Sequence, residues 1–147
     1  MKHLNYLVCL LAMTMLCGSA YARDVQNMRP LDAALKSEEA KKLLDPKFKI
    51  FFGKQAAPKI EKSLGETGMK RSTSRSASDD YDPCVHAFVR AMLDFQERAR
   101  AAGGNAVVNV RSNYKNNEVS SETEYTCVSG NTVTAVAFKG ELVKLAE

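Results

Sequence analysis

The hydrophobic positions of residues 82–102, DPCVHAFVRAMLDFQERARAA, recur every three or four residues. This spacing places them in one stripe along an α-helix and leaves the charged residues on the other faces. Asp82 suits the N-cap of such a helix, Pro83 its first position, and Gly103 its C-terminal end. The segment therefore predicts an amphipathic helix whose buried stripe contains Cys84, Phe88, Met92, Phe95, Ala99 and Ala102.

Shorter apolar patterns elsewhere in the chain predict β-strands. KFKIFFG (47–53) alternates in the manner of a half-buried strand, and a weaker strand is expected around 64–72. Further strands are expected over 105–110, 122–129 and 132–145, the last with a possible break at Gly140. Within each of three strands, alternation predicts which residues share one face of the sheet: Phe48, Ile50 and Phe52; Ala106, Val108 and Val110; and Thr123, Tyr125 and Cys127. The small Ala135 and Ala137 are expected to let the helix approach the sheet closely.

The remaining segments complete the predicted fold. Residues 23–29 are expected to be flexible, and 29–46 have a helical pattern with Ser37 as an N-cap. Loops are expected at 74–82 and 112–120, and a turn at Gly130-Asn131. These elements predict an α+β fold: a small, mostly antiparallel sheet with one main amphipathic helix packed on it, plus a short N-terminal helix. The expected organisation is an N-terminal extension over 23–46 followed by a single domain over 47–147.

The first 22 residues have the pattern of a secretory signal peptide. Lys2 precedes an apolar run over 4–16, which is too short to span a bilayer. Ala20 and Ala22 occupy the two small positions of a cleavage site, so we expect cleavage between Ala22 and Arg23, and a periplasmic product with no membrane span. Attachment of a lipid to Cys9 or Cys17 is disfavoured, because neither cysteine follows a small residue.

Cleavage would leave two cysteines, Cys84 and Cys127, in an oxidising compartment. We therefore predict a disulfide between the helix stripe and the strand face beneath it. In the chain-entropy model a closed loop of this size contributes at most about 4 kcal/mol. The alternative is a redox-active or metal-binding pair, but the chain has no C-x-x-C motif, and His86 is the single histidine after the signal peptide.

The charge and the motifs of the chain indicate few residues with a catalytic or ligand-binding role. The formal net charge is only +4, and the one basic cluster, Lys70, Arg71 and Arg75, lacks the aromatic interleaving of a nucleic-acid binder. GGNAVV follows a helix, so it does not predict a phosphate-binding loop. We therefore expect no catalytic residue, no cofactor, no metal and no nucleic-acid partner. The residues weighed for a role are His86, the carboxylate pair Glu122 and Glu124, and the possible partner contacts Phe51, Tyr81, Tyr114 and Lys115.

Several segments resemble a known group of proteins. FKIFFG, LGETG, ERARAAGGNAVVNVRSNYK, TEYTCVSG and AVAFKG, in this order, are similar to an uncharacterised family of exported bacterial proteins sometimes labelled as excinuclease ABC components. The order of elements also resembles the periplasmic domain of the Rcs stress-sensor lipoprotein and the Ybj heavy-metal-binding-domain fold. The sensor implies a helix-to-strand disulfide and an envelope role, and the Ybj family implies ring oligomers. The excinuclease label implies a P-loop and zinc cysteines, which this chain lacks.

These observations lead to three hypotheses of function. The first is a periplasmic, non-enzymatic module that binds an envelope protein or another envelope component and is stabilised by one disulfide. The second is a thiol/disulfide redox-responsive protein that uses Cys84 and Cys127, which requires an accessible and easily reduced bridge. The third is a structural homo-oligomer.

Overall fold

The computed structural model describes residues 24–75 and 81–146. The expected signal peptide, with Cys9, Cys17, Ala20 and Ala22, lies outside the described residues, as does Arg23, the expected first residue after cleavage. The elements, in chain order, are β1 (Val25–Pro30), α2 (Leu31–Leu35), α3 (Glu38–Leu43), β2 (Lys49–Phe52), β3 (Ile60–Ser74), α4 (Pro83–Ala101), β4 (Ala106–Tyr114), β5 (Asn117–Val119), β6 (Glu124–Ser129) and β7 (Val133–Leu145). The α+β class with one main helix is confirmed. The sheet, with seven strands in the described part of the chain, is larger than predicted.

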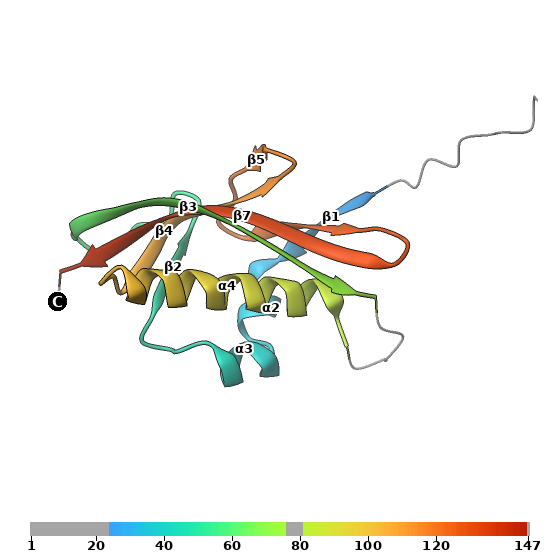
Figure 1. Cartoon of the computed structure of the whole chain (residues 1–147), viewed down its shortest axis with the longest axis horizontal. Coiled ribbons are helices and arrows are strands. Elements are labelled where there is room, and N and C mark those ends of the chain that lie inside the picture. Colours follow the sequence, from blue (N-terminus) through green and yellow to red (C-terminus); the bar gives the residue numbers. More distant parts are fainter. Residues whose placement is uncertain (1–23, 76–80, 147) are drawn as a thin grey trace, which may run out of the picture.

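Strand β7 organises the sheet. β3 pairs with it along its whole length, while β6 and β4 share its other edge, β6 near its start and β4 nearer its end. β1 pairs with β6, and β5 forms a hairpin with β4. All of these pairs are antiparallel, and only β2 lies parallel to its neighbour, β4. Helices α2, α3 and α4 lie on one side of the sheet and the β4–β5 hairpin rises on the other (Figure 1).

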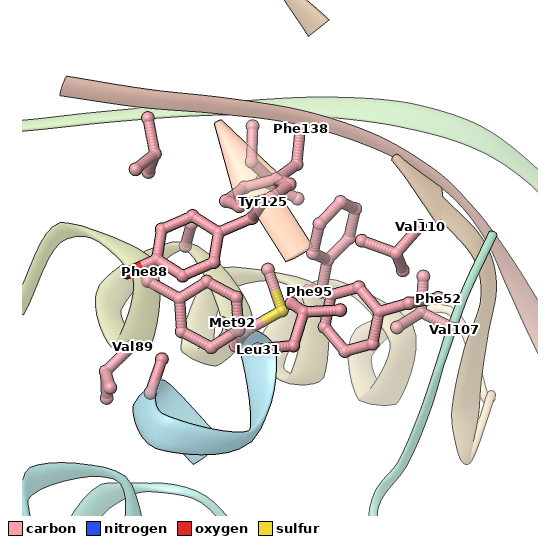
Figure 2. Packing of buried hydrophobic residues seen from close by; sticks show 14 of the residues in the cluster. Leu31, Phe52, Phe88, Val89, Met92, Phe95, Val107, Val110, Tyr125 and Phe138 are labelled. Atoms are coloured by element: carbon pink, nitrogen blue, oxygen red, sulfur yellow. The ribbon is translucent and has the colours of Figure 1, made fainter. Parts of the chain in front are cut away.

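The core lies between α4 and the sheet. Phe88 is fully buried there, with its ring centroid 4.6 Å from that of Tyr125, 5.7 Å from that of Phe138 and 6.0 Å from that of Phe52. Figure 2 shows these rings together with Met92 and Phe95 of α4 and Leu31 of α2. Aromatic rings at such separations add to the free energy gained by burying their surface.

The main helix begins and ends as its sequence predicts. Asp82 is the N-cap, because its Oδ1 accepts hydrogen bonds from the backbone N–H groups of Cys84 (2.9 Å) and Val85 (3.3 Å). Gly103 has a φ of 82°, the left-handed conformation that ends helices. The predicted stripe is buried from Cys84 to Ala99. Ala102 is exposed instead, because it is the C-cap and lies beyond the last buried turn.

The N-terminal segment is more ordered than predicted. Residues 23–29 were expected to be flexible, but Val25–Pro30 form the edge strand β1, which pairs with β6. The helical pattern of 29–46 forms two short helices, α2 and α3, and Ser37 caps the second by accepting a hydrogen bond from the N–H of Ala40. Leu31 and Ala40 belong to the core, so 24–46 share their sheet and core with the following residues.

Two other segments form more regular structure than expected. β3 runs from Ile60 to Ser74, well beyond the weak strand predicted around 64–72. The segment 112–120, predicted as a loop, is a hairpin between β4 and β5. Its turn residues Lys115 and Asn116 have φ values of 52° and 63°, the conformation of tight hairpin turns.

A β-bulge overturns one prediction about the sheet faces. Asn109 has a φ of 51°, and the pairing of β4 with β7 shifts between Val108 and Arg111. An extra residue in a strand turns the following side chains to the opposite face. Val107 and Val110 therefore face the helix, while Ala106 and Val108 face away, contrary to the predicted grouping of Ala106, Val108 and Val110.

The close approach of sheet and helix occurs at Gly140 and not at Ala135 and Ala137. β7 continues unbroken through Gly140, where an added Cβ would lie 2.8 Å from Cγ2 of Val107 and 3.4 Å from Cε1 of Phe95. Ala135 and Ala137 alternate with the core residues of β7 and lie on the face away from α4. None of the described helices is long and apolar enough to cross a membrane.

Candidate binding face

The two faces of the sheet differ in what covers them. The helix face carries the main core, whereas the opposite face, called here the outer face, has a second apolar cluster of four buried residues at one end: Ala106, Val108, Val143 and Leu145. Phe51 packs against this cluster, so this candidate contact residue lies on the outer face. The rest of the outer face is hollowed beside the β4–β5 hairpin.

Two adjoining hollows lie on the outer face. The larger, of about 580 Å³, is bordered by Asp24, Lys70, Tyr114, Asn131 and Ala135, among others. The smaller, of about 320 Å³, is bordered by Gly68, Asn113, Lys115 and Ala137, among others, and Lys70 and Tyr114 border both hollows. Small residues of β3 and β7 therefore form the floor, and polar side chains from β3, from the hairpin and from Asp24, which directly precedes β1, form the rim.

Asp24 anchors the hairpin at this rim. Its Oδ2 accepts hydrogen bonds from the Tyr114 hydroxyl (3.0 Å) and from Nζ of Lys115 (3.1 Å). The Lys115 hydrogen bond lowers the pKa of the Asp24 carboxyl, and the Asp24 hydrogen bond raises the pKa of the Lys115 ammonium. Partial burial, followed by the hydrogen bond to Asp24, raises the pKa of the Tyr114 phenol. A carboxylate, an ammonium group and an aromatic ring therefore lie together at one edge of the hollows.

Four charged side chains form a closed network farther along the outer face. Arg111 lies 2.7 Å from both Glu66 and Glu118, and Lys139 lies 3.1 Å from each of the same two carboxylates. The hydrogen bonds from Arg111 and then Lys139 lower the pKa values of both glutamates. The Arg111 side chain is only 12% exposed, so its charge is satisfied within the protein. This network therefore fixes β3, β4, β5 and β7 relative to one another.

The predicted disulfide is present on the helix face. Cys84 and Cys127 are bonded, with their Cα atoms 5.8 Å apart, and the bond ties the first turn of α4 to β6. Both cysteines are buried. Beside them Arg29 of β1 forms an ion pair with the N-cap Asp82. The nearby Tyr125 hydroxyl has no hydrogen-bond partner among the described residues, and its burial raises the pKa of the phenol.

The other candidate residues make local contacts. Nδ1 of His86 lies 2.7 Å from Oε1 of Glu39, and the Tyr81 hydroxyl lies 2.8 Å from Oγ1 of Thr73. Glu122 and Glu124 are exposed. Within 24–75 and 81–146, no three histidine, cysteine, aspartate or glutamate side chains gather in a way that could hold a metal ion.

A third hollow lies on the helix side, between α3 and β2. It has a volume of about 350 Å³ and is mostly apolar, with Leu44, Phe48 and Ile50 in its lining. Phe48 belongs to the core and Leu44 and Ile50 pack against it, while the ion pair between Asp45 and Arg100 borders the mouth. This hollow is therefore the margin of the core, whereas the outer face combines an open floor with converging polar groups.

No family model, no curated protein and no solved structure matches this chain. Sequence reasoning identified Tyr114 and Lys115 as possible contacts but missed Asp24, Lys70 and the floor of the hollows. The alternation of the small Ala135 and Ala137 with larger residues was the one available signal of that floor.

Proposed function

We propose that the protein is an exported, non-enzymatic module that binds an envelope protein in the periplasm through the outer face of its sheet. The observation that carries this proposal is the pair of adjoining hollows beside the β4–β5 hairpin. Binding sites are typically concave, with an apolar surface and a few converging polar groups. The floor with Ala135 and Ala137 and the rim with Asp24, Lys70 and Tyr114 have this character.

The charges of the rim favour a polypeptide as the partner. Asp24, Lys70 and Lys115 form a polar rim of both signs around Tyr114, and protein–protein interfaces typically have a polar rim and are enriched in tyrosine. A nucleic-acid site would instead present a continuous basic stripe with stacking aromatic residues. The proposed ligand is therefore a segment of an envelope protein with both polar and small apolar side chains.

The location is supported by the signal-peptide pattern and by the disulfide. A bond between Cys84 and Cys127 forms and persists in oxidising compartments such as the periplasm. The mass of the protein purified from cells tests this part of the proposal. We expect a chain that begins at Arg23 and gains two thiols only on reduction; an intact N-terminus with free thiols would contradict export.

The burial of the bridge favours a structural role over a redox role. Cys127 is 0% exposed and Cys84 is 6% exposed, so a reductant meets little sulfur surface in the folded protein. Thiol–disulfide exchange requires access of the attacking thiolate to a sulfur atom. The disulfide therefore contributes to the proposal as a tie between α4 and β6.

Site-specific photo-crosslinking in intact cells tests the binding face. A photoreactive residue is placed at Asn131 beside the larger hollow or at Asn113 beside the smaller one, and a matched probe is placed at Lys42 on the helix side. We expect the same protein to be captured from both outer-face positions and not from Lys42. Capture from all three positions, or from none under several envelope stresses, would contradict the proposal.

A variant that fills the hollow identifies the contact surface. Ala135→Leu adds a larger side chain to the floor of the larger hollow, so capture from Asn131 should fall while the melting temperature stays near that of the unmodified protein. The captured protein is then purified and its affinity is measured for both forms. Equal affinities would place the binding surface elsewhere.

A further inference from the structure

Strand β3 is the longest strand of the described sheet, and only one of its two edges is paired. Its 15 residues, Ile60–Ser74, pair with β7, and within the described part of the chain no strand pairs with the other edge. Met69 is the only buried residue of the strand. An unpaired edge presents a row of backbone N–H and C=O groups that can pair with a strand of another chain.

A hollow borders part of this strand. A hollow of about 300 Å³ lies between β3 and α4, bordered by Arg71 and Ser72 of the strand and by Leu93 of the helix. The side chains of β3 that face α4 are held against it: Arg71 forms an ion pair with Asp94, and Thr67 accepts a hydrogen bond from Arg98. These contacts lie on the helix face of β3 and not along its unpaired backbone edge.

The charges of β3 are arranged so that the strand complements itself. In an antiparallel pair of β3 strands related by a two-fold axis at Gly68, Glu66 of each copy lies opposite Lys70 of the other. Moving the axis to Glu66 or to Lys70 would place like charges opposite one another. Opposite charges directly across two strands stabilise the pair, and like charges destabilise it. Among these three registers, electrostatic complementarity therefore favours the one centred on Gly68.

We propose that β3 pairs with β3 of a second copy of this chain, antiparallel and about a two-fold axis at Gly68. Such an interface uses the same patch on both copies and closes at the dimer. It joins the two sheets into one and brings the two outer faces side by side. Because Gly68 and Lys70 border the smaller hollow, the hollows of the two copies flank the axis. The dimer does not depend on what the outer face binds.

Cysteine crosslinking tests the register directly. Gly68→Cys places a thiol at the axis, where it faces the same thiol of the second copy. A Cβ at Gly68 has room, since its nearest neighbour is the carbonyl oxygen of Phe138 at 3.7 Å. Ser72→Cys is the matched control, because Ser72 lies opposite Leu64 of the second copy in this register. We expect the oxidised Gly68→Cys protein to form a covalent dimer and the Ser72→Cys protein to remain uncrosslinked. Equal crosslinking of both, or of neither, overturns the register.

A charge swap tests the pairing without new thiols. Lys70→Glu places glutamates opposite each other in both halves of the interface, so the dissociation constant from sedimentation equilibrium should rise by about tenfold or more. Mixing Lys70→Glu with Glu66→Lys restores opposite charges in the mixed dimer alone, so we expect the two variants to associate with each other in preference to themselves.

The outcomes separate this proposal from the proposed function. Glu66 also pairs with Arg111 and Lys139 of its own chain, so thermal melting first establishes that Glu66→Lys folds. The comparison of Gly68→Cys with Ser72→Cys changes no charge, so it tests the register even if Glu66→Lys does not fold. An unmodified protein that sediments as a monomer at all concentrations overturns the dimer. Crosslinks from Asn113 and Asn131 to an envelope protein would still support the binding face in that case.

Discussion

The two faces of the sheet use the same strands for different purposes. On β7 the side chains facing α4 are Val136, Phe138 and Leu142, with Gly140 at the closest approach, and they belong to or border the core. In the middle of β7 the outward side chains are Ala135, Ala137 and Lys139, which are small or charged, whereas Val143 and Leu145 near its end belong to the apolar cluster of the outer face. Beside the hollows, the large apolar side chains of β7 thus face α4, and its small outward side chains leave room on the outer face for a ligand.

The disulfide and the charged network show the same division. The disulfide joins α4 to β6 within the buried layer, so the helix face is held by covalent and apolar contacts. The outer face is held by ion pairs among Arg111, Lys139, Glu66 and Glu118, which remain in contact with solvent. We therefore expect changes on the helix face to affect stability strongly, and changes on the outer face to affect stability weakly and binding more.

The largest expected effect is at the centre of the helix face. Phe88→Ala removes the ring that contacts Phe52, Tyr125 and Phe138, and should lower the free energy of unfolding by about 3–5 kcal/mol. Val133→Ala, at a side chain that is 45% exposed near the start of β7, is the matched control, with an expected change within about 0.5 kcal/mol. Urea unfolding followed by circular dichroism measures both. Similar losses would show that the two faces contribute alike.

Removal of the disulfide should have the next largest effect. The double substitution Cys84→Ala and Cys127→Ala should lower the free energy of unfolding by about 2–4 kcal/mol while capture from Asn131 is retained. In the unmodified protein the bridge should resist reduction by dithiothreitol until denaturant is added, because both cysteines are buried. Rapid reduction in native buffer, measured by thiol labelling, would instead favour the redox-responsive function.

Two glycines on opposite faces give a closer comparison. Gly140→Ala places a Cβ 2.8 Å from Val107 and 3.2 Å from Val110, so overpacking should destabilise the protein by about 1–3 kcal/mol. Gly68→Ala meets nothing nearer than 3.7 Å on the outer face, so its effect should stay below about 1 kcal/mol. Thermal unfolding of both variants measures the difference. A harmless Gly140→Ala would mean that the side chains of Val107 and Val110 can shift to make room for the methyl group.

Local sequence patterns predicted the helix face well. The stripe of α4, its Asp82 cap and the pairing of Cys84 with Cys127 follow from periodicity, capping preference and cysteine count, and the structure confirms the helix, its cap and the bridge. Each of these depends on residues close together in the sequence or on the scarcity of cysteine. The order of the strands depends instead on contacts between residues far apart in the sequence. The strand β1 was missed for this reason, because its partner, β6, lies about a hundred residues away in the chain.

The outer face was harder to predict because single residues determine which side chains lie on it. The bulge at Asn109 reverses the faces of β4, and no pattern of apolar residues reveals an extra residue in a strand. The hollows also combine Asp24 of the N-terminal segment, Lys70 of β3 and Tyr114 of the hairpin, which the fold alone brings together. Hydrophobic periodicity therefore predicted what is buried, but not which polar side chains converge.

The smallest expected effect concerns the charged network of the outer face, and it depends on pH. Hydrogen bonds from Arg111 and Lys139 hold the pKa of Glu118 below its ordinary value of 4.5. A carboxyl whose pKa is lowered on folding stabilises the protein above the unfolded pKa, and this stabilisation is lost as the pH falls through the folded pKa. Glu118→Gln should therefore lower the melting temperature near neutral pH and have little effect well below pH 4.5.

The matched control for this titration is Glu122→Gln, because Glu122 is exposed and its side chain forms no ion pair among the described residues. Its melting temperature should follow that of the unmodified protein at every pH. If the deficit of Glu118→Gln persisted in acid, the glutamate would be acting through packing of the hairpin and not through its charge. A deficit that disappears in acid would instead show that the outer face is held by electrostatic contacts, while the helix face keeps the fold intact without them.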